Sequence, residues 1–168
     1  MLACDRRILS IPFLRRRLWG RLDHMRPDQR LVDAAVEQMR RRARTEAAAV
    51  YLHDGSILTS VALDNLNAAA NLCAETGAIC RAHTLGATIT ASVFVSAWED
   101  DSGISVLAPC GICQERLAPW GPDVLVGVAA PETDSGWAVR SLRELNPFYW
   151  GRYFADGDAW PAPGIHSP

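Results

Sequence analysis

C-A-E at residues 73–75 and P-C-G-I-C at residues 109–113 constrain the fold of this chain more than any other part of it. Together they carry three thiols and one carboxylate. The segment between them is long enough for the rest of one helix and two strands. If the thiols act together, the fold must bring the starts of two helices into contact.

The candidate metal ligands are Cys73, Cys110 and Cys113. Cys110 and Cys113 are three residues apart, so at the start of a helix both sulfurs lie on one face. A helix N-terminus favours negative charge, which lowers the pKa of a thiol and favours the thiolate that binds metal. Catalytic zinc typically has three protein ligands and keeps a fourth position for water. We therefore predict one zinc ion per chain.

Glu75 has a different predicted role. It is too close to Cys73 in the chain to be a natural fourth ligand, and it is better placed as a general acid and base. The alternatives are a solvated Glu75, and a C-x-x-C motif that is a redox dithiol or half of a zinc ribbon. A ribbon needs a second C-x-x-C, which the chain lacks, and a redox motif would not explain C-A-E. Cys80 is expected to be a core thiol.

Composition narrows the class of protein. The 168 residues suit one domain with a substantial core, and a net charge of −2 excludes the basic excess of a nucleic-acid-binding protein. Five cysteines, three of them candidate ligands, favour a reducing compartment, and we expect a cytoplasmic protein. The apolar run at residues 8–14 is too short to span a bilayer, so no membrane association is expected.

Three segments are expected along the chain. Residues 1–24 form a basic extension, residues 25–155 the main domain, and residues 156–168 a tail rich in proline and glycine. The extension is interpreted as a basic anchor or docking arm, as a disordered extension, or as an upstream start that precedes a natural beginning at Met25.

The pattern between those ends alternates helices and strands. An apolar stripe at helical spacing, with Leu31, Ala35 and Met39, predicts the first helix, and Asp54-Gly55 predicts a hairpin. The other expected elements are strands at 47–53, 56–63, 87–98, 104–107 and 123–129, and helices at 73–84, from 110 to before 121, and at 139–145. We predict an α/β protein with three layers (α/β/α) and a mixed sheet of five strands.

With these motifs, the chain resembles the cytidine deaminase family, including its blasticidin S deaminase-like members, from about residue 31 to residue 150. C-x-E followed by P-C-x-x-C is the signature of zinc-dependent nucleobase deaminases. Residues 50–55 also resemble the family's first hairpin, and residues 141–147 its C-terminal S-L-x-E-L-x-P helix. The resemblance implies hydrolytic deamination of a small molecule by a homodimer or homotetramer that binds no nucleic acid.

The resemblance also implies roles for individual residues. Cys73, Cys110 and Cys113 match the family's zinc ligands, and Glu75 matches its proton shuttle. In the family, the backbone N–H at the position of Ala74 contacts the pyrimidine carbonyl. These positions are intact.

Three residues that directly follow the two motifs depart from the family pattern. Thr76 stands where C-A-E-R has an arginine, and Gln114 and Glu115 stand where Arg-Gln usually follows P-C-x-x-C. In members with three thiolates this arginine helps to neutralise the sulfurs. Arg81 and Arg116 are the candidates to replace it.

The sugar-binding motif departs as well. The family's N-x-E-N aligns with residues 62–65, where Asn65 matches, Asp64 is a shortened form of the ribose-binding glutamate, and Ala62 cannot donate a hydrogen bond. Arg44 falls where the family has an aromatic that packs on the substrate. A site built to hydrogen-bond a sugar strongly rejects a poorly matching partner, so the substrate is more open than the reaction.

Three functions follow from these departures. The chain deaminates a cytidine-like nucleoside, or another aminated heterocycle such as a blasticidin S-type antibiotic nucleoside, or it is a catalytically silent scaffold stabilised by zinc. The intact Glu75 argues against the scaffold, which needs no carboxylate at that position.

Overall fold

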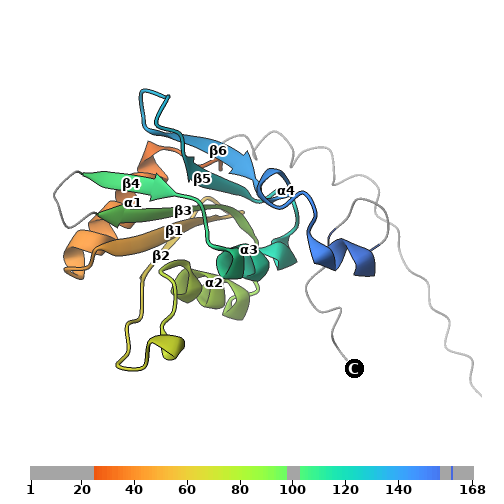
Figure 1. Cartoon of the computed structure of the whole chain (residues 1–168), viewed down its shortest axis with the longest axis horizontal. Coiled ribbons are helices and arrows are strands. Elements are labelled where there is room, and N and C mark those ends of the chain that lie inside the picture. Colours follow the sequence, from red (N-terminus) through yellow and green to blue (C-terminus); the bar gives the residue numbers. More distant parts are fainter. Residues whose placement is uncertain (1–24, 98–102, 156–159, 161–168) are drawn as a thin grey trace, which may run out of the picture.

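The computed structural model describes residues 25–97, 103–155 and 160, which contain a mixed six-stranded sheet (Figure 1). The strand order is β2-β1-β3-β5-β6, and β4 pairs with β3 beside this path. Only β3 and β5 run parallel to each other among the described pairs. The strands are β1 (Glu46–Leu52), β2 (Ile57–Val61), β3 (Ile89–Ala97), β4 (Ile104–Leu107), β5 (Leu125–Ala129) and β6 (Trp137–Ser141).

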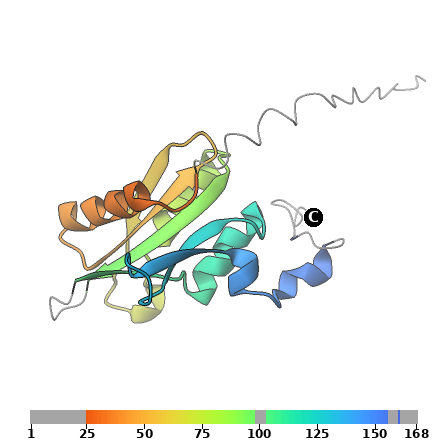
Figure 2. The same cartoon turned by 90° about the horizontal axis from the view of Figure 1, so that it is seen from above.

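Helices cover both faces of the sheet, as Figures 1 and 2 show together. On one face α1 (Gln29–Arg41) packs against β1 and β3, and Leu31, Ala35 and Met39 lie in this core. On the other face α2 (Glu75–Thr84) and α3 (Gly111–Leu117) form a second core with β1 and β5. Short helical turns complete the described chain: η2 (Ala68–Ala70), η3 (Ala118–Trp120), α4 (Leu142–Leu145) and η4 (Trp150–Phe154).

The predicted three-layer α/β fold is confirmed, with six strands in place of five. The additional strand is β6, so the expectation of a helix from residue 139 was wrong for residues 139–141. These residues pair with β5 across a turn at residues 130–136. The helix begins only after Ser141, whose side chain and that of Glu144 form a capping box.

Two other expectations concern the ends of the chain and one cysteine. The proposed extension at residues 1–24 lies outside the described residues, and so does the tail except for Trp160. Trp160 is buried, with its ring 4.3 Å from that of Tyr149. Cys80 is exposed, so its expected place in the core was wrong. It lies on the solvent side of α2, whose buried side is formed by Ala78, Ile79 and Ala82.

One serine holds the start of α2 against the sheet. Ser60 on β2 donates a hydrogen bond to the carbonyl of Ala74 and accepts one from the backbone N–H of Ala78 at 3.0 Å. Gly77 allows this close approach, because a Cβ there would lie 2.9 Å from the Cβ of Ser60. The segment that carries Cys73 and Glu75 is therefore fixed to β2.

Gly127 on β5 is a second position where packing requires glycine, and it gives a stability prediction. A Cβ at Gly127 would lie 2.7 Å from Cγ1 of Val106 and 3.2 Å from Cγ1 of Val93. The two valine side chains have few accessible χ1 rotamers and cannot easily move away from an added methyl group. Gly127→Ala should therefore lower the free energy of unfolding by about 1–3 kcal/mol. Denaturant unfolding would measure this, with Gly111→Ala as the control because its Cβ meets nothing within 4 Å. Equal stability of the two variants would contradict the packing described here.

None of the helices in the described part of the chain is both long and apolar enough to cross a bilayer.

Candidate active site

The three predicted cysteine ligands converge at the starts of two helices. Cys73 lies just before α2, Cys110 is the N-cap of α3, and Cys113 is buried in its first turn. Their sulfurs lie within 4.8 Å of one another, and those of Cys73 and Cys110 are 3.5 Å apart. Sulfurs placed tetrahedrally around zinc at 2.3 Å are about 3.8 Å apart, so this set has the size that zinc needs.

The surroundings of the three thiols affect their ionisation differently. Burial raises the pKa of Cys113 well above its usual range, and the negative charge of Glu75 adds to this rise. Burial also raises the pKa of Cys73. For Cys110, burial acts upward, but hydrogen bonds, chiefly from the backbone N–H of Cys113, bring the pKa below its usual value. A bound metal ion would hold all three as thiolates, because metal binding displaces thiol protons.

Glu75 is the first residue of α2 and is only 2% exposed. Burial raises its pKa, while its own backbone N–H, the Cys113 thiol and the positive charge of Arg116 oppose the rise. The negative charge of Glu46 acts upward. A carboxyl group with a raised pKa is suited to proton transfer near neutral pH, and this one lies beside the cysteine cluster.

The predicted substrate-binding residues are not all together. Ala74 is fully buried at the N-cap of α2, between Cys73 and Glu75. Asn65 instead belongs to an exposed loop, in which its side-chain amide donates to the carbonyl of Ala70 at 2.9 Å. Its backbone N–H donates to the side chain of Asn71 at 2.7 Å. The Asn65 side chain is thus used within its own loop.

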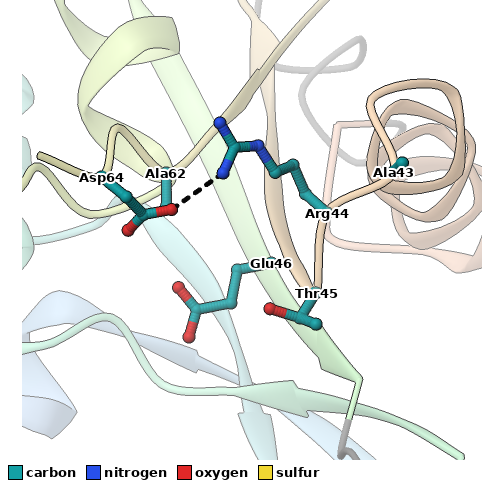
Figure 3. A pocket seen from close by; sticks show the side chains of 6 residues that line it. All are labelled: Ala43, Arg44, Thr45, Glu46, Ala62 and Asp64. Atoms are coloured by element: carbon teal, nitrogen blue, oxygen red, sulfur yellow. Dashed lines mark hydrogen bonds and ion pairs between the residues drawn. The ribbon is translucent and has the colours of Figure 1, made fainter.

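Asp64 lines a pocket of about 360 Å³ at the start of β1 (Figure 3). Its carboxylate forms an ion pair with Arg44, with Nη1 and Oδ2 3.0 Å apart. Positions 44, 62 and 64, which align with substrate-contacting positions of the family, therefore share one cavity. The described lining residues are Ala43, Arg44, Thr45, Glu46, Ala62 and Asp64.

Glu46 is a member of this pocket that sequence analysis missed. Its carboxylate lies on the same side as that of Asp64, below the ion pair in Figure 3. The sequence does contain a pattern that indicates this position. Glu46 lies two residues after Arg44, and residues two apart in an extended segment point to the same side.

Of the two candidate arginines, Arg116 contacts the segment that carries C-A-E. Its Nη1 donates to the hydroxyl of Thr76, which is nearly buried, at 2.7 Å. Arg81, the other candidate, is exposed on α2. The guanidinium of Arg116 is thus tied to the residue that follows Glu75.

Gln114 and Glu115, the other two departures, have structural partners. The side-chain amide of Gln114 donates to the carbonyl of Pro109 at 2.9 Å and closes the first turn of α3. Glu115 accepts hydrogen bonds from the Tyr149 hydroxyl at 3.0 Å and from the Trp150 indole at 3.1 Å. Burial, and then the Glu115 carboxylate, raise the pKa of Tyr149 to about 12. Glu115 therefore attaches the C-terminal aromatic residues to α3.

No family model matches the chain. The proteins and solved structures that resemble it are cytidine deaminases and a blasticidin-S deaminase. The crystal structure of cytidine deaminase from Bacillus anthracis is 38% identical, with a TM-score of 0.68, over 75% of this chain and 91% of that one. Blasticidin-S deaminase of Bacillus cereus is 28% identical over 74% of this chain and 93% of that protein. Cytidine deaminase of Mycobacterium tuberculosis is 33% identical over 79 residues, which are 47% of this chain and 56% of that protein. The chain thus spans only about half the length of this last relative.

Proposed function

The chain belongs to the cytidine deaminase family, and from this membership we propose that it catalyses zinc-dependent hydrolytic deamination of a cytidine-like nucleoside, with release of ammonia. One observation carries the proposal: three cysteine sulfurs within 4.8 Å of one another lie beside a buried glutamate, at the starts of two helices. A redox dithiol needs only two of these sulfurs and no buried carboxylate.

The residues of the site would divide the reaction among them. Cys73, Cys110 and Cys113 would hold the zinc ion, which supplies the acidity that lets water act as a nucleophile near neutral pH. Glu75 would take the proton from that water and pass it to the ring nitrogen and then to the leaving amine. The backbone N–H of Ala74 would orient the substrate by donating a hydrogen bond to the carbonyl oxygen of the ring. Ser60 holds this backbone in place by donating a hydrogen bond to the carbonyl of Ala74.

Arg116 would balance the charge of the site. Three thiolates and one Zn²⁺ carry a net negative charge, to which the Glu75 carboxylate adds another. We propose that Arg116, held by Thr76, replaces the arginine that relatives carry after C-A-E. Its positive charge acts on the Glu75 carboxylate, which supports this role.

Removing the positive charge of Arg116 should weaken zinc binding or catalysis. Arg116→Gln should lower zinc affinity or kcat/KM by about 10- to 100-fold, the usual effect of losing a group that supports metal ligands. Zinc affinity is measured by competition with a chelator, and kcat/KM by ammonia release. Arg81→Gln is the matched control, since Arg81 is an exposed arginine of α2. If both variants match the wild type, Arg116 has no such role.

A second candidate substrate follows from the altered pocket. The Arg44–Asp64 ion pair and the commitment of Asn65 to its loop leave a ribose with few of the partners implied by the family motif. A deaminase of another aminated heterocycle, such as a blasticidin S-type antibiotic nucleoside, would need no ribose partners, and a blasticidin-S deaminase is among the relatives. The buried Glu75 beside the sulfurs disfavours a catalytically silent scaffold.

We also propose that the protein is a cytoplasmic homo-oligomer that acts on small molecules. The cysteine usage supports a reducing compartment. Large apolar side chains near the C-terminus support a contact with another copy, since extended exposed apolar surface marks interaction sites. They are Phe148, Trp150, Tyr153 and Phe154.

Ammonia release by purified, zinc-loaded protein tests the proposed function. The panel is cytosine, cytidine, deoxycytidine, cytidine monophosphate and blasticidin S. We expect release from at least one nucleoside, with loss of activity after zinc is removed and recovery after it is restored. Absence of ammonia from every compound would refute the proposed function.

A further inference from the structure

We propose that the substrate carries a cationic substituent, an ammonium or guanidinium group, which binds at Glu46 in the pocket at the start of β1. This inference rests on the proposed function and specifies its substrate class. The pocket is the cavity of about 360 Å³ in Figure 3. Pockets of this size hold small ligands or parts of larger ones.

The charges that line the pocket do not cancel. Arg44 contributes one positive charge, and its guanidinium is already paired with Asp64 at 3.0 Å. The Glu46 carboxylate has no hydrogen bond or ion pair with any residue that the structure describes. One negative charge therefore remains without a counter-charge on the pocket wall, and a cationic group would supply it.

The course of the chain leads from Glu46 to the proposed site of reaction. Glu46 begins β1, where Ala47 pairs with Val61, so Glu46 lies beside the end of β2 that leads to Ala62. The chain then returns through the bridge between Leu63 and Leu72 to the cysteine cluster.

A substituent on the substrate could thus bind at Glu46 while the aminated ring reacts at Glu75. Binding energy from the substituent would then help to orient the ring.

Neutral and anionic substituents fit the same walls less well. A sugar hydroxyl finds no side-chain donor at Ala62, and the Asp64 carboxylate is engaged by Arg44. A hydroxyl can donate to the Glu46 carboxylate, but it leaves the negative charge of Glu46 uncompensated. A phosphate would compete with Asp64 for Arg44 and would face the charge of Glu46. Like charges placed opposite each other disfavour the wrong partner, so the pocket selects against an anionic substituent.

Nucleosides with the same ring and different charged substituents test this inference. Cytidine is compared with its 5′-amino and 3′-amino analogues, which replace one hydroxyl by an amine, and with cytidine 5′-monophosphate. We expect kcat/KM for the better amino analogue to exceed that for cytidine by about 10-fold at low salt, with the monophosphate lowest. The ratio should fall as salt is raised, because salt screens charges at a half-exposed site.

Single-residue variants show whether the preference for a cationic substituent depends on Glu46. Glu46→Gln should bring the ratio of amino analogue to cytidine close to one, whereas Arg44→Gln should raise the ratio because it frees Asp64. Glu132→Gln removes an exposed carboxylate from the β5–β6 turn and should keep the wild-type ratio. Thermal unfolding shows whether each variant is folded. If Glu46→Gln does not fold, the salt dependence of the wild-type ratio decides.

The outcomes distinguish failure of the proposed deaminase function from failure of the cationic-substituent inference. If no compound releases ammonia, the proposed deaminase function fails. If cytidine is deaminated as well as the amino analogues, or the monophosphate is best, the deaminase stands and the cationic-substrate inference is overturned. A ratio that is high but unchanged in Glu46→Gln would also overturn it.

Discussion

Glu75→Gln is expected to reduce turnover by on the order of 10²–10⁴ while zinc content and fold are retained. Glutamine keeps the size and most of the hydrogen-bonding shape of glutamate, but it cannot take a proton from water at neutral pH. Because Glu75 is buried beside Cys113, solvent cannot easily replace it. Steady-state ammonia release measures turnover, and metal analysis with thermal unfolding checks the rest.

Glu37→Gln provides the control for this result, because Glu37 is an exposed carboxylate on α1. It should behave as the wild type does. A folded, zinc-loaded Glu75→Gln protein with near wild-type turnover would remove Glu75 from the mechanism.

The second large effect is expected from the cysteines. Cys73→Ala, Cys110→Ala and Cys113→Ala should each lose most of the zinc from an initial value of about one per chain, because a catalytic zinc site has only three protein ligands. Turnover should fall at least as far as in Glu75→Gln, since the acidity supplied by zinc is lost. Metal analysis after gel filtration measures the zinc content.

Cys80→Ala is the matched control for these variants, because Cys80 is an exposed thiol on α2. It should retain full zinc and full turnover. Full zinc content in Cys110→Ala would show that the metal is held elsewhere.

The parts of the site that could be predicted are those encoded by local spacing. Cys110 and Cys113 are one helical turn apart, and C-A-E places Glu75 directly after Cys73. The structure brings the three sulfurs and this carboxylate together, as the motifs indicated. Their roles as ligands and as proton shuttle stay predictions until the variants above are measured.

The parts that could not be predicted depend on contacts between distant residues. Arg44 and Asp64 are 20 residues apart, and Arg116 and Thr76 are 40 apart. No local pattern links such pairs, so sequence could name Arg116 as a candidate but could not choose it over Arg81. Likewise, β6 is a strand because it pairs with β5, and its own sequence did not distinguish it from the start of the following helix.

The fate of the water oxygen tests the central claim, zinc-dependent hydrolytic deamination, most directly. The zinc-loaded protein is incubated with cytidine, or with the best substrate of the panel, in water enriched in oxygen-18, and the product is examined by mass spectrometry. Hydrolysis predicts one labelled oxygen in each product molecule and one ammonia released with it, both absent from the zinc-free protein. An unlabelled product, or the same yield without zinc, would contradict the account.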